Sequence, residues 1–182
     1  MTCASWEAFC EDLAAQALRH LAEHATDGSR LPEELKKSIK ADPTRKNQHE
    51  LAVWTLDDDG WRAVLRTRAE RLTHGDDQTL NTPQTGQLKA FFCAEAGLPD
   101  ITACWYWAGS SREKTAKRLD DLVTLRGSIA HRRSPDGGVL KKHATDALEL
   151  IQRLAAKSAD AVSAFLEQHT DRPLPVLDAQ GP

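Results

Sequence analysis

Two residues of the sequence, Arg126 and His131, have side chains suited to doing chemistry together. They stand five positions apart in the pattern R-x-x-x-x-H. Arginine presents a planar fork of donors that matches phosphate oxygens, and the ordinary pKa of histidine, about 6.5, makes both of its protonation states accessible near neutral pH. Such a pair could bind a phosphate and transfer a proton beside it. Spacing alone favours a simpler reading, an exposed arginine and a histidine that complements the dipole at a helix end.

One helix over 119–133 (LDDLVTLRGSIAHRR) is expected to carry both side chains. Its apolar residues recur at spacings of three and four, as on one face of a helix. They are Leu119, Leu122, Val123, Leu125 and Ile129. Ser110 or Ser111 can cap the start, and the run SPDGG at 134–138 ends the helix.

The spacing of the pair restricts how the two side chains can meet. Five positions of ideal helix separate Arg126 from His131 by about 140° around the axis and about 7.5 Å along it. The long arginine must therefore reach around the helix toward a histidine in the last turn. Gly127, Ser128 and Ala130 leave a surface of small residues nearby, which a second helix could approach closely.

Charge is unevenly distributed along the chain. The 182 residues carry a net charge of −3, which argues against a protein that coats nucleic acid. Between 112 and 143, however, basic residues exceed acidic ones by five. A local basic zone on an acidic protein fits a phosphate-binding site, although a solvated helix face would have the same composition.

Metal chemistry has only weak candidates. Residues His20 to His24 read HLAEH, which matches the H-x-x-E-H pattern of inverted zinc peptidases, but a polar helix face is the favoured interpretation. The triplet Asp57–Asp59 lacks the spacing of a calcium loop and is expected to cap a helix. The cysteines form no CxxC pair and are expected to be reduced thiols: Cys3, Cys10, Cys93 and Cys104. We therefore expect neither a metal nor a cofactor.

The remaining pattern is helical throughout, which predicts an all-α bundle of long antiparallel helices with additional short ones. The expected helices span 4–25, 32–40, 45–56, 60–73, 83–95, 119–133 and 139–169. In the last of them, either Ala147 or Leu148 should face the core. We expect one domain over 1–172 and a flexible tail over 173–182. No apolar run is long enough to span a bilayer and no signal segment precedes the first helix, so a cytoplasmic location is expected.

Five tryptophans are present, and their roles differ. Trp54 and Trp61 are expected in the core. Trp105, Tyr106 and Trp107 form a cluster beside the basic zone, where aromatic rings could stack on bases. A buried cluster under a loop explains the same residues equally well.

The run from Asn81 to Arg133 resembles the RiboL-PSP type of the HEPN superfamily. Three segments carry the resemblance: NTPQTGQLKAFFCAEAGL, DITACW and LDDLVTLRGSIAHR, the last being similar to the family pattern LxxLVxxRNxIAHG. The resemblance implies an all-helical HEPN fold and a symmetric homodimer that brings two motifs into one cleft. It also implies metal-independent endoribonuclease activity, commonly in toxin or anti-phage defence systems, where an antitoxin or another defence protein is the expected partner.

The resemblance assigns roles by position. Arg126 stands where the family arginine binds the scissile phosphate, and His131 stands where the family histidine handles the proton of the 2′-hydroxyl or of the leaving 5′-oxygen. The implied products are a 2′,3′-cyclic phosphate and a 5′-hydroxyl. The remaining candidates are RNA-binding residues (Arg132, Arg133, Lys117 and Arg118) and accessory residues (Glu113 and Ser128). Glu113, Lys117 and Arg118 also fit an E-x-x-x-K-R element found in some HEPN families.

Gly127 departs from the family pattern, which usually has a polar residue, often asparagine, at this position. The departure leaves a second hypothesis open, a HEPN-like module that has lost catalysis and binds RNA, nucleotide or a partner protein. A DNA-binding regulator is less well supported, because no helix-turn-helix with an exposed recognition helix stands out.

Overall fold

The computed structural model describes residues 2–41, 60–74, 80, 83–130 and 141–175. Its helices are α1 (Thr2–His24), α2 (Glu33–Ala41), α4 (Gly60–His74), α5 (Thr85–Ala96), α6 (Arg112–Ala130) and α7 (Lys141–Thr170), with the short 3-10 helices η1 (Gly28–Arg30) and η3 (Ile101–Cys104). These described parts contain no β-strand, and the prediction of an all-α bundle is confirmed. The helix expected over 45–56, the Asp57–Asp59 triplet and Trp54 lie outside the described residues.

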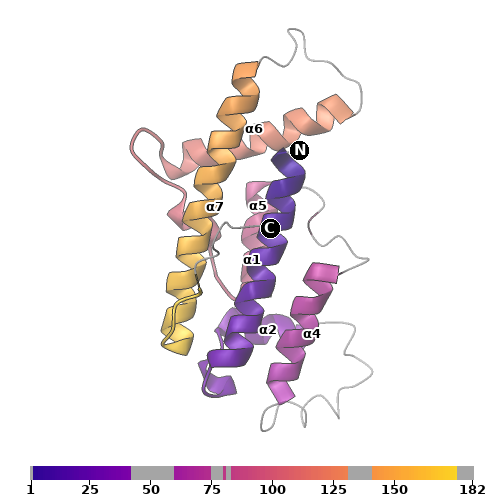
Figure 1. The fold of residues 1–182 in the computed structure, drawn as a ribbon, viewed down its shortest axis with the longest axis vertical. Coiled ribbons are helices and arrows are strands. Elements are labelled where there is room, and N and C mark those ends of the chain that lie inside the picture. The colour runs from indigo at the N-terminus through magenta and orange to yellow at the C-terminus, as the bar shows by residue number, and fades with distance from the viewer. Residues whose placement is uncertain (1, 42–59, 75–79, 81–82, 131–140, 176–182) are drawn as a thin grey trace.

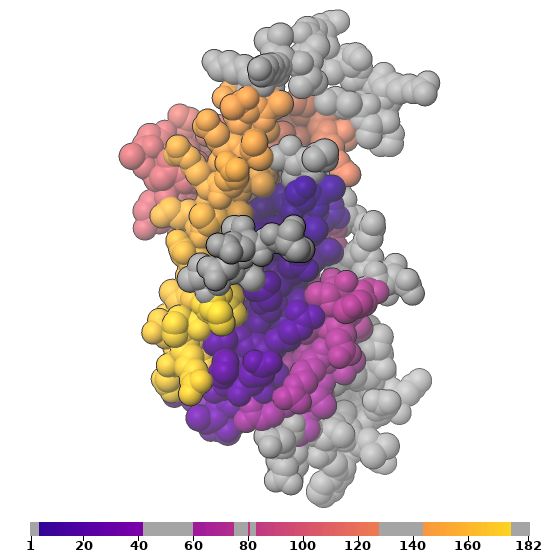
Figure 2. All heavy atoms as spheres, viewed as in Figure 1, coloured from indigo at the N-terminus to yellow at the C-terminus, as the bar shows by residue number. Residues whose placement is uncertain are grey.

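Helix α1 runs through the centre of the bundle (Figure 1). It packs against α4, α5 and α7, and Figure 2 shows α7, α1 and α4 side by side on one face. Helix α6 crosses the end of the bundle where α1 and α7 begin (Figure 1). The residues of interest on α6 therefore lie at one end of the molecule.

The two longest helices run in the same direction, whereas an antiparallel arrangement was expected. Near the start of α1, Trp6 packs edge-on against Trp105, with ring centroids 6.4 Å apart. The Trp105 indole donates a hydrogen bond of 3.0 Å to Ser158 in α7. Near the end of α1, His20 contacts Thr170 at the end of α7. Helices α1 and α4, by contrast, are antiparallel, since Arg62 at the start of α4 donates to the Ala25 carbonyl just after α1. The hydrophobic period of each helix could not reveal these directions.

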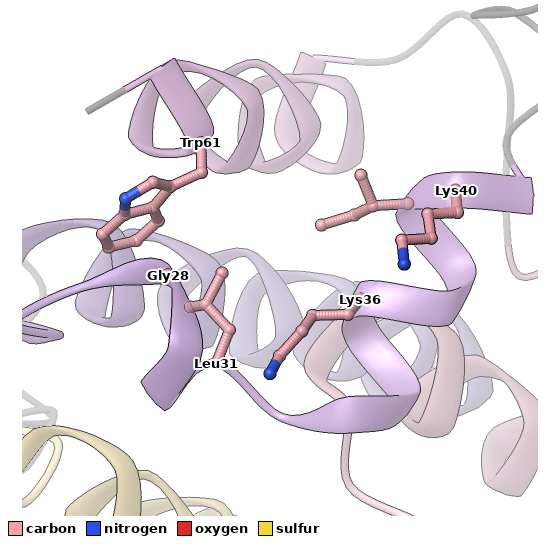
Figure 3. Close-up of a pocket in the computed structure, with 6 residues that line it drawn as sticks. Gly28, Leu31, Lys36, Lys40 and Trp61 are labelled. Atoms are coloured by element: carbon pink, nitrogen blue, oxygen red, sulfur yellow. The ribbon is translucent and has the colours of Figure 1, made fainter. Parts of the chain in front are cut away.

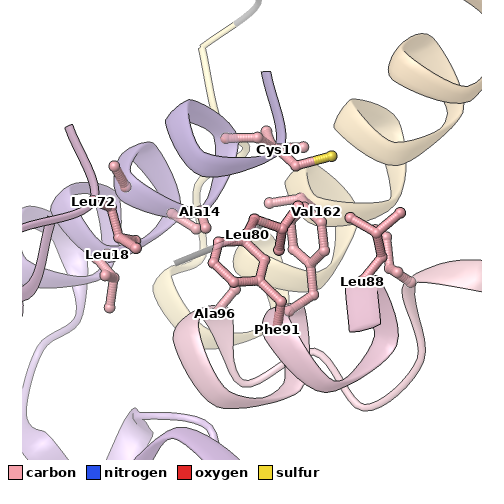
Figure 4. Close-up of a cluster of buried hydrophobic side chains, with 14 of the residues drawn as sticks. Cys10, Ala14, Leu18, Leu72, Leu80, Leu88, Phe91, Ala96 and Val162 are labelled. Carbon is pink, nitrogen blue, oxygen red and sulfur yellow. The ribbon is translucent and has the colours of Figure 1, made fainter. Parts of the chain in front are cut away.

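The core is built around small and aliphatic side chains of α1. Ala14, Ala17 and Leu18 are fully buried, and alanine at these positions lets neighbouring helices approach closely. Figure 4 shows how Leu18 of α1, Leu72 of α4 and other apolar side chains meet in one cluster. Trp61 is buried, as predicted. In α7 it is Ala147 that is half-buried, while Leu148 remains 50% exposed and Leu150 is buried instead.

The two ends of α5 are determined differently, one by the local sequence and the other by a tertiary contact. Gly97 ends it in the left-handed conformation (φ 74°), as its position after the helix predicts. The start lies at Thr85, two residues later than expected. The backbone N–H of Thr85 donates to the Asp120 carboxylate of α6 at 2.7 Å, so the cap comes from a distant helix and not from the adjacent Gln84.

Two groups of buried polar contacts join the helices. Arg68 of α4 donates to both carboxylate oxygens of Glu95 in α5 and to Ser38 of α2. At the other group, His20 Nε2 lies 3.1 Å from Thr170 Oγ1 and 3.0 Å from the Arg172 carbonyl.

The first residues of the tail expected over 173–182 lie within the described part of the chain and contact α7. The backbone N–H of Leu174 donates to Ser163 of α7 at 3.0 Å, and the leucine side chain packs on the core. The tail beyond 175 lies outside the described residues.

None of the described helices combines the length and the apolar character needed to cross a bilayer.

Candidate functional site

Helix α6 is fixed to the bundle at its start, and this anchor sets the direction of the helix. Ser111 caps it by accepting the Lys114 N–H at 3.3 Å. Arg112 reaches back to Asp100 and to the Thr102 hydroxyl. Burial alone would raise the pKa of Asp100, but hydrogen bonds from Thr102, Lys89 and Arg112 hold this pKa at about 2. Asp100 is therefore a permanent negative charge that anchors the start of α6.

The inner face of α6 holds the middle of the helix in place. Thr115 and Leu119 are fully buried, and Val123 is nearly so. The remaining faces of the helix are available for other contacts. Anchoring at the start and along one face leaves the last turns of α6 projecting toward the end of the bundle.

Arg126 lies in these last turns and is exposed to solvent. Its guanidinium is close enough to Glu7 of α1 for the two charges to interact. Partial burial raises the pKa of Glu7, and the positive charge of Arg126 opposes this effect. Glu7 was not predicted as part of the site. Because it lies 119 positions away in the chain, only the fold, which places the start of α1 near α6, reveals it (Figure 1).

The histidine of the motif cannot be placed beside the arginine. His131, Arg132 and Arg133 lie outside the described residues. Ser128 lies within α6.

The other candidate residues on α6 do not gather around Arg126. Lys117 forms an ion pair of 2.8 Å with Asp121 and points about 180° away from Arg126 around an ideal helix. Glu113 lies near the start of α6, about 20 Å along the axis from Arg126. Hydrogen bonds from its own backbone N–H and from Ser111 lower the Glu113 pKa, as in a helix cap.

Arg118 lines a groove between α6 and α7 that has a volume of about 330 Å³. Its other lining residues are Asp121, Leu122, Leu125, Asp146, Ala147 and Leu150. Two carboxylates and several apolar side chains thus accompany a single arginine. This groove is not the basic furrow that an RNA strand requires.

A second cavity is enclosed by three elements: the turn that follows α1, helix α2 and helix α4 (Figure 3). It measures about 180 Å³ and is walled by Trp61, Leu31 and Ile39, with Lys36 and Lys40 at its edge. Lys36 already donates to the Ser29 carbonyl at 3.0 Å and lies 3.6 Å from Glu33. Among the described residues, the polar side chains of the lining are these two lysines, and we assign the cavity no catalytic role.

The described residues give no support to a metal site. No group of three or more histidine, cysteine or acidic side chains converges within these parts of the chain. In the HLAEH segment, His20 uses Nε2 for its contacts with Thr170 and Arg172, although its ring lies 4.6 Å from that of His24. The segment serves as packing between the ends of α1 and α7.

No family model matches the chain, and neither the curated proteins nor the solved structures contain a match.

Proposed function

We propose that the chain is a metal-independent endoribonuclease of the HEPN type that acts as a homodimer. The observation that supports this proposal is the position of Arg126, which is exposed in the last turns of α6, where its charge lowers the pKa of Glu7. Here the guanidinium is accessible to a phosphate, and the motif histidine follows it in the chain.

The proposed reaction needs no group beyond the chain and water. The 2′-hydroxyl oxygen attacks the adjacent phosphorus while His131 accepts its proton, and the bond from phosphorus to the 5′-oxygen breaks. The leaving oxygen takes a proton, which gives a 2′,3′-cyclic phosphate and a 5′-hydroxyl. Arg126 stabilises the charge that develops on the phosphate oxygens. Arg132 and Arg133 guide the RNA strand toward the site.

A second copy of the chain would complete the site. Leu122 and Leu125 on α6 are half-exposed and Leu148 on α7 is exposed, which provides apolar area for self-association. A Cβ added at Gly127 would meet no atom within 4 Å in the described part of the chain. Space for an approaching helix is therefore open beside Arg126. We include in the proposal a cytoplasmic setting in a toxin or anti-phage system, with an antitoxin or defence protein as partner.

The decisive experiment is cleavage of single-stranded RNA by purified protein in excess EDTA. We expect cleavage with 2′,3′-cyclic phosphate ends in the wild type, and its loss in both Arg126→Ala and His131→Ala. Arg66→Ala is the matched control, since Arg66 is also exposed but lies on α4. Cleavage that persists in both motif variants would overturn the proposal, as would a strictly monomeric active protein in sedimentation.

Glu7→Gln tests the neighbourhood of Arg126 in the same assay. Removing this negative charge makes the electrostatic potential around the guanidinium more favourable for phosphate. Since exposed charge pairs contribute up to about 1 kcal/mol, we expect RNA binding to tighten by up to about fivefold. Unchanged or weaker binding would show that Glu7 does not compete with RNA.

Gly127 supports a second candidate function, a binding module without catalysis. Because the space around Gly127 is open, packing within the described chain does not require glycine there. An asparagine introduced by Gly127→Asn can therefore be accommodated. Cleavage that appears only in this variant, with RNA binding already present in the wild type, would favour the binding module.

A further inference from the structure

A cavity of about 230 Å³ lies on α7 under the loop that follows η3. Trp107 of the loop and four residues of α7 line it: Arg153, Ala156, Lys157 and Asp160. The neighbouring Tyr106 is 62% exposed, and its ring centroid lies 5.9 Å from Lys157 Nζ. The Arg153 guanidinium carbon lies 5.6 Å from the Trp107 ring centroid. Two aromatic rings and two cations thus meet at one place on the surface.

The loop that presents these rings is held rigidly. The buried Trp105 side chain anchors it to α7 through the 3.0 Å hydrogen bond to Ser158. Trp107 and Ser110 exchange backbone hydrogen bonds of 3.1 and 2.9 Å, and Gly109 makes the turn between them with φ 83°. The rings are therefore positioned before any ligand arrives, which lowers the entropy lost on binding.

The two cations are available for a ligand. Arg153 and Lys157 are four positions apart on α7, so they project from the same face. Within the described parts of the chain, neither forms an ion pair, and each lies over one of the two rings. Structural cations are usually neutralised by carboxylates, as Lys117 is by Asp121. The arrangement resembles a binding surface more than a network that supports the fold.

We propose that this cavity is a stacking subsite for two consecutive nucleotides of single-stranded RNA, an inference that rests on the RNA-directed function proposed above. One base lies against Trp107 and the next against Tyr106, while Arg153 and Lys157 contact the phosphate that joins the two nucleotides. The loop joins the start of α6, and about 21 Å of helix separates Arg112 from Arg126. The subsite is therefore distinct from the cleavage site and would hold a neighbouring part of the same strand.

Asp160 determines what the cavity accepts. Its carboxylate repels a bare phosphate, so the ligand must present a hydrogen-bond donor on that side. Adenine, cytosine and guanine each carry an exocyclic amino group that can donate to a carboxylate. Uracil has a single N–H flanked by two carbonyl oxygens, which the carboxylate repels. We expect a preference against uridine.

The test uses 2′-O-methyl oligomers, which lack the attacking hydroxyl and so separate binding from cleavage. Fluorescein-labelled oligo(A) and oligo(U) of eight nucleotides are titrated with the protein and followed by anisotropy. Wild type should bind oligo(A) more tightly than oligo(U). Trp107→Ala should weaken oligo(A) binding by about five- to a hundredfold, and Trp107→Phe, which keeps a stacking ring, should lose much less.

Charge variants keep the inference testable if Trp107→Ala perturbs the loop. The double variant Arg153→Ala/Lys157→Ala should weaken binding and reduce the salt slope by about 0.7 per lost phosphate contact. The matched control Lys40→Ala/Arg66→Ala removes the same charge elsewhere on the surface and should have a much smaller effect. An equal loss of RNA affinity in both double variants would show that Arg153 and Lys157 act only through general electrostatics, which would refute the subsite.

Other results would also overturn the inference. Full affinity in Trp107→Ala and in Arg153→Ala/Lys157→Ala would remove these residues from RNA binding. If these variants changed the sedimentation mass but not the RNA affinity, the surface around Trp107 would be a contact between protein chains. Equal affinity for both oligomers would remove the assigned role of Asp160. Absence of oligomer binding in the wild type would refute the subsite, while cleavage in EDTA would still decide the nuclease activity independently.

Discussion

Substituting Glu95 by alanine should strongly destabilise the bundle. Glu95 accepts hydrogen bonds from the Arg68 guanidinium, one of them 2.9 Å long between Nη2 and Oε1. The two side chains are only 9% and 13% exposed. Without Glu95, the guanidinium keeps only its hydrogen bond to the neutral hydroxyl of Ser38. The variant therefore leaves a buried positive charge without its counter-ion.

The expected size of the effect follows from this geometry. Breaking a buried ion pair by removing one partner costs about 3–5 kcal/mol, because the desolvation of the remaining charge is no longer offset. For a chain of this length, each 1 kcal/mol lowers Tm by about 2–4 °C. Glu95→Ala should therefore lower Tm by roughly 6–20 °C.

Urea unfolding followed by circular dichroism would measure the change in free energy directly. Glu70→Ala is the control, since this exposed glutamate of α4 should change stability by less than about 0.5 kcal/mol. The double variant Arg68→Met/Glu95→Leu removes both charges and should recover most of the lost stability. A loss of less than about 1 kcal/mol in Glu95→Ala, or a double variant less stable than the single one, would refute the reasoning.

Two further predictions concern the joints between helices. Gly97→Ala should destabilise the fold by more than about 2 kcal/mol, because the residue has φ 74° and an added Cβ would lie 2.4 Å from Cβ of Pro32. Gly86 has open space around it, so the control Gly86→Ala should be near neutral in the same urea assay. Burial lowers the pKa of His20, which outweighs the opposite effect of the Arg172 carbonyl, so the fold favours the neutral ring. Stability should therefore decrease as pH falls from about 6.5 toward the lowered pKa, and His20→Gln, but not the exposed His74→Gln, should flatten this dependence in unfolding curves recorded between pH 7.5 and 5.

The helices themselves could be predicted because each depends on local information. The apolar period places Trp6, Leu13 and Leu21 on the buried face of α1, and Gly97 marks the end of α5. The start of α5 could not be located in this way, since its cap is Asp120 on another helix. Helix direction was similarly hidden, because a period of 3.6 residues is the same for parallel and antiparallel neighbours.

The features of the candidate site also differ in whether they depend on local sequence or on packing. The exposure of Arg126 agrees with a helix whose apolar residues lie on another face. The proximity of Glu7 depends on how α1 packs, and no sequence pattern indicates it. Arg153 and Lys157 were missed because two cations four positions apart are common on helix surfaces. Only the rings beside them distinguish these two from other cations on helix surfaces.

The parallel arrangement of α1 and α7 has a consequence for biosynthesis. The contact between His20 and Thr170 joins residues 150 positions apart, and α1 is the helix around which the others pack. During translation, the apolar face of α1 is not fully covered until α7 has been synthesised. Until then the nascent protein exposes an apolar surface that chaperones could bind or that could cause premature self-association. Loss of α7 should therefore leave an aggregation-prone fragment.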